Sequence, residues 1–116
     1  MKARIYHNPR CSKSRATKAL LEARGIELEV IEYLRTPLTQ QALGALLGKL
    51  GMNARDLLRT GEAEFKASGI QAQTATDAEL IELMASQPKL IERPIVEVGA
   101  SARVGRPPEN VLGLFE

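Results

Sequence analysis

The fold is decided by residues 3–15, ARIYHNPRCSKSR, in which a strand pattern gives way to a helix pattern within a few positions. Residues 3–7 predict a short strand that ends at Asn8-Pro9, and residues 11–24 predict a helix. The apolar positions of this helix fall on one face, formed by Ala16, Ala19, Leu20 and Ala23. A second strand is predicted over residues 28–34, and the helix between the two strands makes them parallel.

The rest of the chain predicts a helical insertion, then a hairpin and a last helix. Over about residues 39–88, leucines at helical spacing after Thr39 and a capping box formed by Thr76 and Glu79 predict several helices. Residues 94–98 and 102–105 have the pattern of paired strands, and Pro107-Pro108 suits the first turn of a final helix. This order predicts one α/β domain over residues 1–116, of the thioredoxin-like class, with a four-stranded mixed sheet and helices on both faces.

The composition is that of a small globular protein and narrows the classes of function. A chain of 116 residues suits one domain, and a net charge of +2 gives no reason to expect a nucleic-acid partner. No apolar run reaches the roughly 20 residues of a membrane helix, and no signal-peptide pattern is present. A single cysteine cannot form an internal disulfide, and with one histidine it cannot complete a zinc cage. We therefore expect a cytoplasmic monomer without a bound metal or organic cofactor.

The single cysteine, Cys11, follows a strand and a tight turn and then enters a helix. Unpaired N–H groups and the helix dipole favour an anion at such a position, so the sequence predicts a thiolate there. A lone cysteine is most often a small buried hydrophobe, but Arg10, Ser12 and Lys13 are not the neighbours of a core residue. Ser14, one turn further along the helix, is placed to donate a hydrogen bond to the sulfur. The sequence therefore predicts that Cys11 is a redox nucleophile.

Two related motifs are excluded, and the role of one neighbour stays open. Ser14 stands where a C-x-x-C motif has its second cysteine, so a disulfide cycle needs an external thiol. Thr17 stands where a C-x5-R phosphate loop has its arginine, which excludes that architecture. His7, four residues before Cys11, either pairs with the thiolate or orients the loop, or it is a surface histidine at a strand end.

The segment His7-Asn8-Pro9-Arg10-Cys11 resembles the active-site loop of the glutaredoxin-coupled arsenate reductases, the ArsC-like family with a thioredoxin-like fold. Further segments agree in order and at compatible spacing over nearly the whole chain: residues 33–37, 57–59, 91–96 and 103–107. Ser12-Lys13 replaces the Gly-Thr of the plasmid-borne members, and the chain closes at Glu116 without their longer tail. In both respects the sequence is most similar to the short chromosomal arsenate reductase-like group.

The resemblance implies a role for each site residue. Cys11 would attack arsenate, and His7 and Ser14 match residues that the family places beside the thiolate. Arg59, Arg93 and Arg106 match the three arginines that bind the oxyanion; outside the family context each would be an ordinary surface arginine. Planar guanidinium groups suit a tetrahedral oxyanion because they bind its oxygens bidentately. Pro94 matches the proline that follows a cis peptide bond next to the active cysteine.

The resemblance also implies the reaction, a step in arsenic detoxification, with arsenate as substrate, glutathione as co-substrate and glutaredoxin as partner. Two alternatives stay open. The chain could be a thiol-dependent reductase of another oxyanion or of a glutathionylated substrate. It could also be a Spx-like transcriptional regulator, although Ser14 removes the C-x-x-C redox switch typical of that family.

Overall fold

The computed structural model describes all residues from Met1 to Glu116, and they form two compact units. The first unit combines both ends of the chain, residues 1–36 and 93–116, and the second unit is the continuous segment 37–92. The second unit encloses the helical insertion expected over about residues 39–88. No helix is both long enough and apolar enough to cross a membrane.

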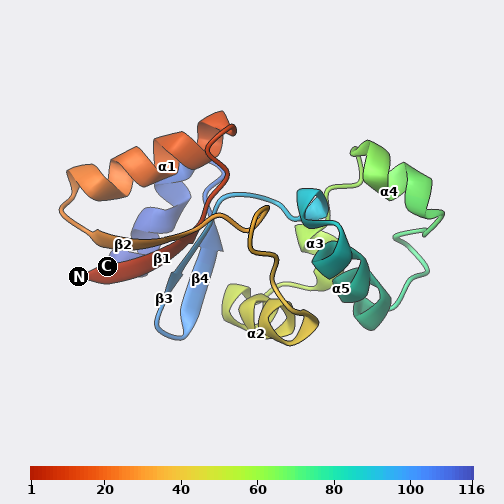
Figure 1. Cartoon of the computed structure of the whole chain (residues 1–116). Coiled ribbons are helices and arrows are strands. Elements are labelled where there is room, and N and C mark those ends of the chain that lie inside the picture. Colours follow the sequence, from red (N-terminus) through yellow and green to blue (C-terminus); the bar gives the residue numbers. More distant parts are fainter. The chain divides into compact units, whose positions relative to one another are not determined.

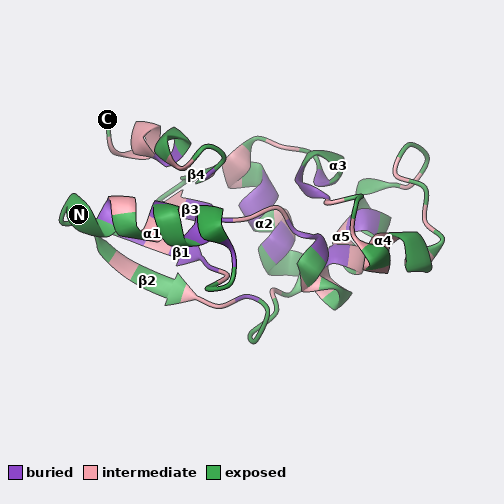
Figure 2. Ribbon diagram, turned by 90° about the horizontal axis from the view of Figure 1, so that it is seen from above, coloured by how far each residue is buried: buried purple, intermediate pink, exposed green.

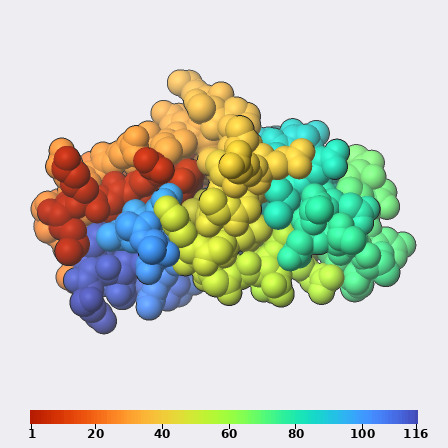
Figure 3. Space-filling view, turned by 90° about the horizontal axis from the view of Figure 1, so that it is seen from below, coloured from red at the N-terminus to blue at the C-terminus, as the bar shows by residue number.

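The first unit is built on a four-stranded mixed sheet (Figure 1). Its strands are β1 (Lys2–Tyr6), β2 (Glu27–Ile31), β3 (Ile95–Val98) and β4 (Ser101–Val104), in the spatial order β2-β1-β3-β4. β1 runs parallel to β2 and antiparallel to β3, which forms a hairpin with β4. In the space-filling view, residues near the N-terminus, in red, lie next to residues near the C-terminus, in blue (Figure 3). The predicted α/β class and mixed sheet are confirmed.

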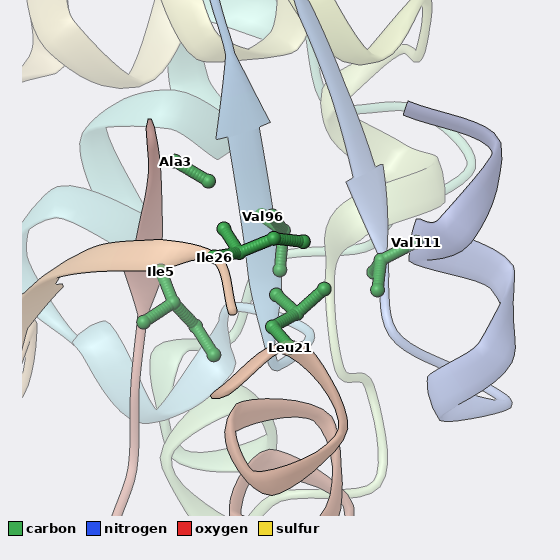
Figure 4. Close-up of a cluster of buried hydrophobic side chains, with 6 residues drawn as sticks. All are labelled: Ala3, Ile5, Leu21, Ile26, Val96 and Val111. Carbon is green, nitrogen blue, oxygen red and sulfur yellow. The ribbon is translucent and has the colours of Figure 1, made fainter. Parts of the chain in front are cut away.

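One face of this sheet carries the core of the first unit. Helix α1 (Ser12–Ala23) and the 3₁₀ helix η2 (Pro108–Phe115) pack against each other, and η2 also packs against β3 and β4. Between them lies a buried cluster formed by Ala3, Ile5, Leu21, Ile26, Val96 and Val111 (Figure 4). Burial of each large aliphatic side chain in such a cluster contributes about 1.5–3 kcal/mol. Through Leu21, this cluster holds α1 against the sheet.

The buried face of α1 differs from the prediction. Its buried residues are Ser14, Thr17 and Leu21, whereas the predicted alanines at 16, 19 and 23 are exposed. Thr17 can be fully buried because its hydroxyl donates to the Lys13 carbonyl, 2.8 Å away in the same helix. An alanine carries too little apolar surface to decide which side of a helix faces the core.

Two other elements differ in extent or type from the prediction. β2 ends at Ile31 rather than at residue 34, and it is an edge strand with largely exposed side chains (Figure 2). The final helix after Pro107 is of the 3₁₀ type, with Val111 buried and its other apolar residues half-buried against the core.

The second unit is helical. It contains α2 (Gln40–Leu50), α3 (Ala54–Leu57), α4 (Ala63–Ser68), α5 (Asp77–Ser86) and the 3₁₀ turn η1 (Pro88–Leu90). Thr39 caps α2 and the Thr76–Glu79 capping box starts α5, as the sequence predicts. The fully buried side chains of this unit include Leu43, Leu57, Leu80, Met84 and Leu90. An antiparallel bridge between Leu58 and Ile91 fixes the backbone that carries Arg59 and Glu92: the Arg59 N–H donates to the Leu90 carbonyl, and the Glu92 N–H donates to the Leu57 carbonyl.

Candidate active site

Cys11, the nucleophile expected from the sequence, is the N-cap residue of α1. A tight turn leads into it, closed by a hydrogen bond from the Cys11 N–H to the Asn8 carbonyl at 3.0 Å. The Asn8 side chain accepts from the Arg10 N–H at 3.0 Å, and Arg15 donates to the Pro9 carbonyl at 2.9 Å. These contacts hold the loop in one conformation, so the sulfur lies at the end of the helix where its N–H groups are unpaired.

His7 and Ser14 meet directly behind this loop. Ser14 Oγ lies 2.6 Å from His7 Nδ1 and also accepts a hydrogen bond from the Asn8 N–H at 3.0 Å. Both side chains are buried. Burial lowers the pKa of His7 from its usual value, and the positive charge of Lys18 lowers it further. The two residues therefore form a neutral pair at pH 7 that joins β1 to α1 through side-chain contacts.

The guanidinium of Arg106 lies against the sulfur. Its Nη2 atom lies 3.9 Å from Cys11 Sγ, and its Nε donates to the Arg93 carbonyl at 2.8 Å. That contact ties Arg106 to the segment before β3. The Arg93–Pro94 bond is cis, and so is the Arg106–Pro107 bond, which no sequence pattern singled out.

Gly105 brings the cis-proline segment against α1, a role that the sequence analysis missed. Its N–H donates to the Pro94 carbonyl at 2.8 Å. A Cβ atom at this position would lie 2.6 Å from Thr17 Oγ1 and 2.8 Å from Pro94 Cγ. Only glycine fits between these two residues without displacement. The glycine itself is visible in the sequence, but nothing local to it reveals the contact with Thr17.

Arg59 belongs to the second unit, where carboxylates surround it. Its Nη1 lies 3.1 Å from Glu62 Oε1, and its Nε lies 3.7 Å from Glu92 Oε1. The strand-like pairing of residues 57–59 with residues 90–92 sets its backbone position. The other six expected site residues lie in the first unit: His7, Cys11, Ser14, Arg93, Pro94 and Arg106.

The first unit therefore presents a sulfur nucleophile at a helix N-terminus, with a guanidinium beside it. This arrangement suits the binding of an anion next to the sulfur, because both the helix end and the arginine stabilise negative charge. No group of three or more His, Cys, Asp and Glu side chains is arranged to hold a metal ion. The chemistry available to this site is nucleophilic attack by sulfur.

Comparison with known proteins gives close relatives over nearly the whole chain. The ArsC family matches residues 6–114. The arsenate reductase of Neisseria meningitidis is 44% identical over 109 residues, which are 93% of each chain. The uncharacterized protein YfgD of Escherichia coli is 50% identical over 110 residues, 94% of this chain and 92% of its own. The solved structure of the arsenate reductase from Vibrio cholerae has a TM-score of 0.93 at 47% identity and covers 97% of each chain.

Proposed function

Because this chain belongs to the ArsC family, we propose that it is an arsenate reductase that uses glutathione and glutaredoxin and forms a covalent adduct on Cys11. The observation that carries this proposal is the position of Arg106 Nη2, 3.9 Å from the sulfur at the N-terminal end of α1. An anion bound there has the nucleophile on one side and a hydrogen-bonding cation on another. Arg93 serves as a further oxyanion ligand in this proposal, and the family resemblance alone assigns the same role to Arg59.

The proposed reaction has three steps. The Cys11 thiolate attacks arsenic, a sulfur–arsenic bond forms, and one arsenate oxygen leaves as water after protonation. The thiolate of glutathione then attacks the Cys11 sulfur, and the electron pair of the sulfur–arsenic bond remains on arsenic, which departs as arsenite. Finally a glutaredoxin thiolate attacks the glutathione sulfur and releases Cys11 as a thiolate. An external thiol is needed because Cys11 is the only cysteine of the chain.

The neutral His7–Ser14 pair contributes by holding the loop rather than by carrying charge. Ser14 Oγ, in the first turn of α1, lies 2.6 Å from His7 Nδ1 and accepts from the Asn8 N–H at 3.0 Å. These contacts connect the end of β1 to α1 across the loop that carries the nucleophile. We propose that the protein is a monomer and that it works in the cytoplasm, where glutathione keeps thiols reduced. The site requires no metal ion for sulfur attack in this scheme.

The deciding experiment is arsenate-dependent oxidation of NADPH by the purified protein with glutathione, glutaredoxin and glutathione reductase. We expect turnover that Cys11→Ser abolishes and that the control Ser12→Ala leaves intact, because Ser12 is exposed at the helix surface. Turnover that persists in Cys11→Ser would overturn the proposed mechanism. If arsenate gives no activity, a glutathionylated peptide offered in the same assay separates a general thiol reductase from a protein without reductase activity.

A further inference from the structure

A cavity of about 250 Å³ opens beside the loop that carries the nucleophile. One wall is formed by residues 7–10, and the other by Glu32, Leu34 and Arg35, which follow β2. We propose that this cavity binds the charged backbone of a thiol peptide of the glutathione type and presents its sulfur to Cys11. The proposal rests on the proposed function, since it identifies where the reducing co-substrate of that reaction binds.

Both walls of the cavity are held by hydrogen bonds. The loop wall is closed by the contacts of Asn8 with the N–H groups of Arg10 and Cys11. On the other wall, the Glu32 carbonyl accepts from Arg35 N–H at 2.9 Å and from Thr36 N–H at 3.0 Å. The His7 N–H donates to the Ile31 carbonyl at 2.8 Å and joins the two walls. The cavity is therefore a fixed part of the first unit rather than a gap between loose loops.

The charges around the cavity match a zwitterionic peptide. Arg10 and Arg35 supply two guanidinium groups and Glu32 supplies one carboxylate, whose Oε1 lies 3.8 Å from Arg35 Nε. Glutathione carries the opposite set, two carboxylates and one ammonium group. Leu34, 39% exposed, adds an apolar surface for the chain between them. A simple oxyanion fits less well, because Glu32 repels it.

The position of the cavity allows the thiol to reach Cys11. Arg10 lines the cavity and directly precedes Cys11, so their Cα atoms are about 3.8 Å apart. Cys11 itself does not line the cavity, so in this proposal the two ends of the peptide bind among the charges and its central cysteine extends over Arg10 toward the sulfur. An extended tripeptide spans about 10 Å, enough to pass one residue of the loop. The sulfur of the bound peptide then meets the sulfur at the start of α1.

The test is thiol–disulfide exchange without arsenate. The Cys11 thiolate attacks oxidised glutathione, a sulfur–sulfur bond to one glutathione forms, and the other glutathione leaves as a thiolate. Rates are measured by mass spectrometry and compared with those for bis(2-hydroxyethyl) disulfide, which is uncharged. Both Arg35→Gln and Glu32→Gln should slow the glutathione reaction about two- to fivefold, as expected for exposed charge pairs, and leave the neutral disulfide unaffected. The control Arg24→Ala, exposed at the end of α1, should change neither.

The two substitutions separate binding from electrostatic steering. Oxidised glutathione is a net anion, so long-range attraction alone would make Arg35→Gln slower but Glu32→Gln faster. A rise in the Glu32→Gln rate, or equal changes with both disulfides, overturns the proposal. Independently of any variant, S-methylglutathione should shift the amide resonances of His7, Asn8 and Arg10 and of residues 32–35; shifts confined to other residues, or no shifts at all, overturn the proposal as well.

The failure of this proposal is distinguishable from that of the proposed function. Selective exchange with glutathione together with no arsenate turnover would leave the cavity assigned and remove arsenate. Arsenate turnover with no selectivity for glutathione in exchange would remove the cavity and leave the reductase. If a glutaredoxin, rather than the tripeptide, shifts the resonances of both walls, the cavity is a protein-docking surface and the proposal is wrong.

Discussion

The two units of this chain use arginine in opposite ways. In the first unit, Arg106 directs one guanidinium nitrogen toward the Cys11 sulfur and anchors another on the Arg93 carbonyl. In the second unit, Arg59 faces the carboxylates of Glu62 and Glu92. The contact that positions Arg106 is with a neutral carbonyl, whereas the two carboxylates beside Arg59 offset its positive charge.

On the proposed function, this difference predicts that Arg106 acts directly on the sulfur, whereas Arg59 has to exchange a carboxylate partner before it binds arsenate. An anion arriving at Arg106 meets a donor held in position by a backbone contact. An anion arriving at Arg59 has to displace a carboxylate, which lowers the gain from binding. We therefore expect the two arginines to respond differently to substitution.

The largest effect is expected for Arg106→Ala. Loss of a charge-assisted contact should raise the KM for arsenate about 10- to 100-fold and slow the alkylation of Cys11 by iodoacetamide at neutral pH. Arg106→Lys should recover part of the loss, because lysine restores the positive charge but not the planar pair of N–H donors of the guanidinium group. Steady-state kinetics and mass spectrometry provide the measurements, with Arg24→Ala as the control. Unchanged alkylation in Arg106→Ala would show that this arginine does not act on the sulfur.

A pair of glycine substitutions compares the packing of the two units. Gly105→Ala should destabilise the protein by about 1–3 kcal/mol, because the added Cβ would lie 2.6 Å from Thr17 Oγ1. Gly48→Ala, inside α2 of the second unit, meets no atom within 4 Å and should stabilise by up to about 1 kcal/mol. Urea denaturation measures both. Equal signs for the two variants would contradict the tight contact at Gly105.

Local sequence patterns predict the features that depend on neighbouring residues. The start of α1 at Cys11 and the capping box of Thr76 and Glu79 are examples, because a turn, a cap and a helix all lie within a few residues. The same patterns assigned the wrong face to α1, since Thr17 buries its hydroxyl within the helix and the alanines give only a weak signal.

Contacts between distant residues are beyond such patterns. Arg106 and Cys11 are 95 positions apart, and no periodicity relates them; only the family resemblance named Arg106. Of the two carboxylate partners of Arg59, one is local in the sequence and the other is distant. Glu62 is three residues away and visible locally, whereas Glu92 reaches Arg59 through the pairing of Leu58 with Ile91. The cavity behind residues 7–10 likewise depends on how β1 and β2 pair.

A smaller effect is expected from the carboxylate that pairs with Arg59. Glu62→Gln removes the ion pair with Nη1 at 3.1 Å, so arsenate no longer competes with it. If Arg59 binds the substrate, the KM for arsenate should fall about two- to fivefold, the size expected of a half-exposed pair. Glu64→Gln is the matched control, because Glu64 is on the adjacent helix α4 and pairs with Lys89 instead. A raised KM in Glu62→Gln would show that Glu62 positions Arg59 rather than competing for it.

The smallest effect is expected from His7, the only histidine of the chain and therefore a clean spectroscopic reporter of the first unit. Burial and the charge of Lys18 lower its pKa, so its NMR titration midpoint should lie below the usual value of about 6.5. Below about pH 6.5, His7 of the unfolded chain takes up a proton more readily than His7 of the folded chain. This histidine should therefore lower the free energy of unfolding as the pH falls below that value and leave it unchanged at higher pH. In urea denaturation between about pH 5 and pH 7, His7→Gln should show a shallower loss than the wild type, because it lacks this group. A midpoint above 6.5 would mean that the fold favours the charged ring in its contact with Ser14, and identical slopes in the two proteins would mean that folding does not change the pKa of His7.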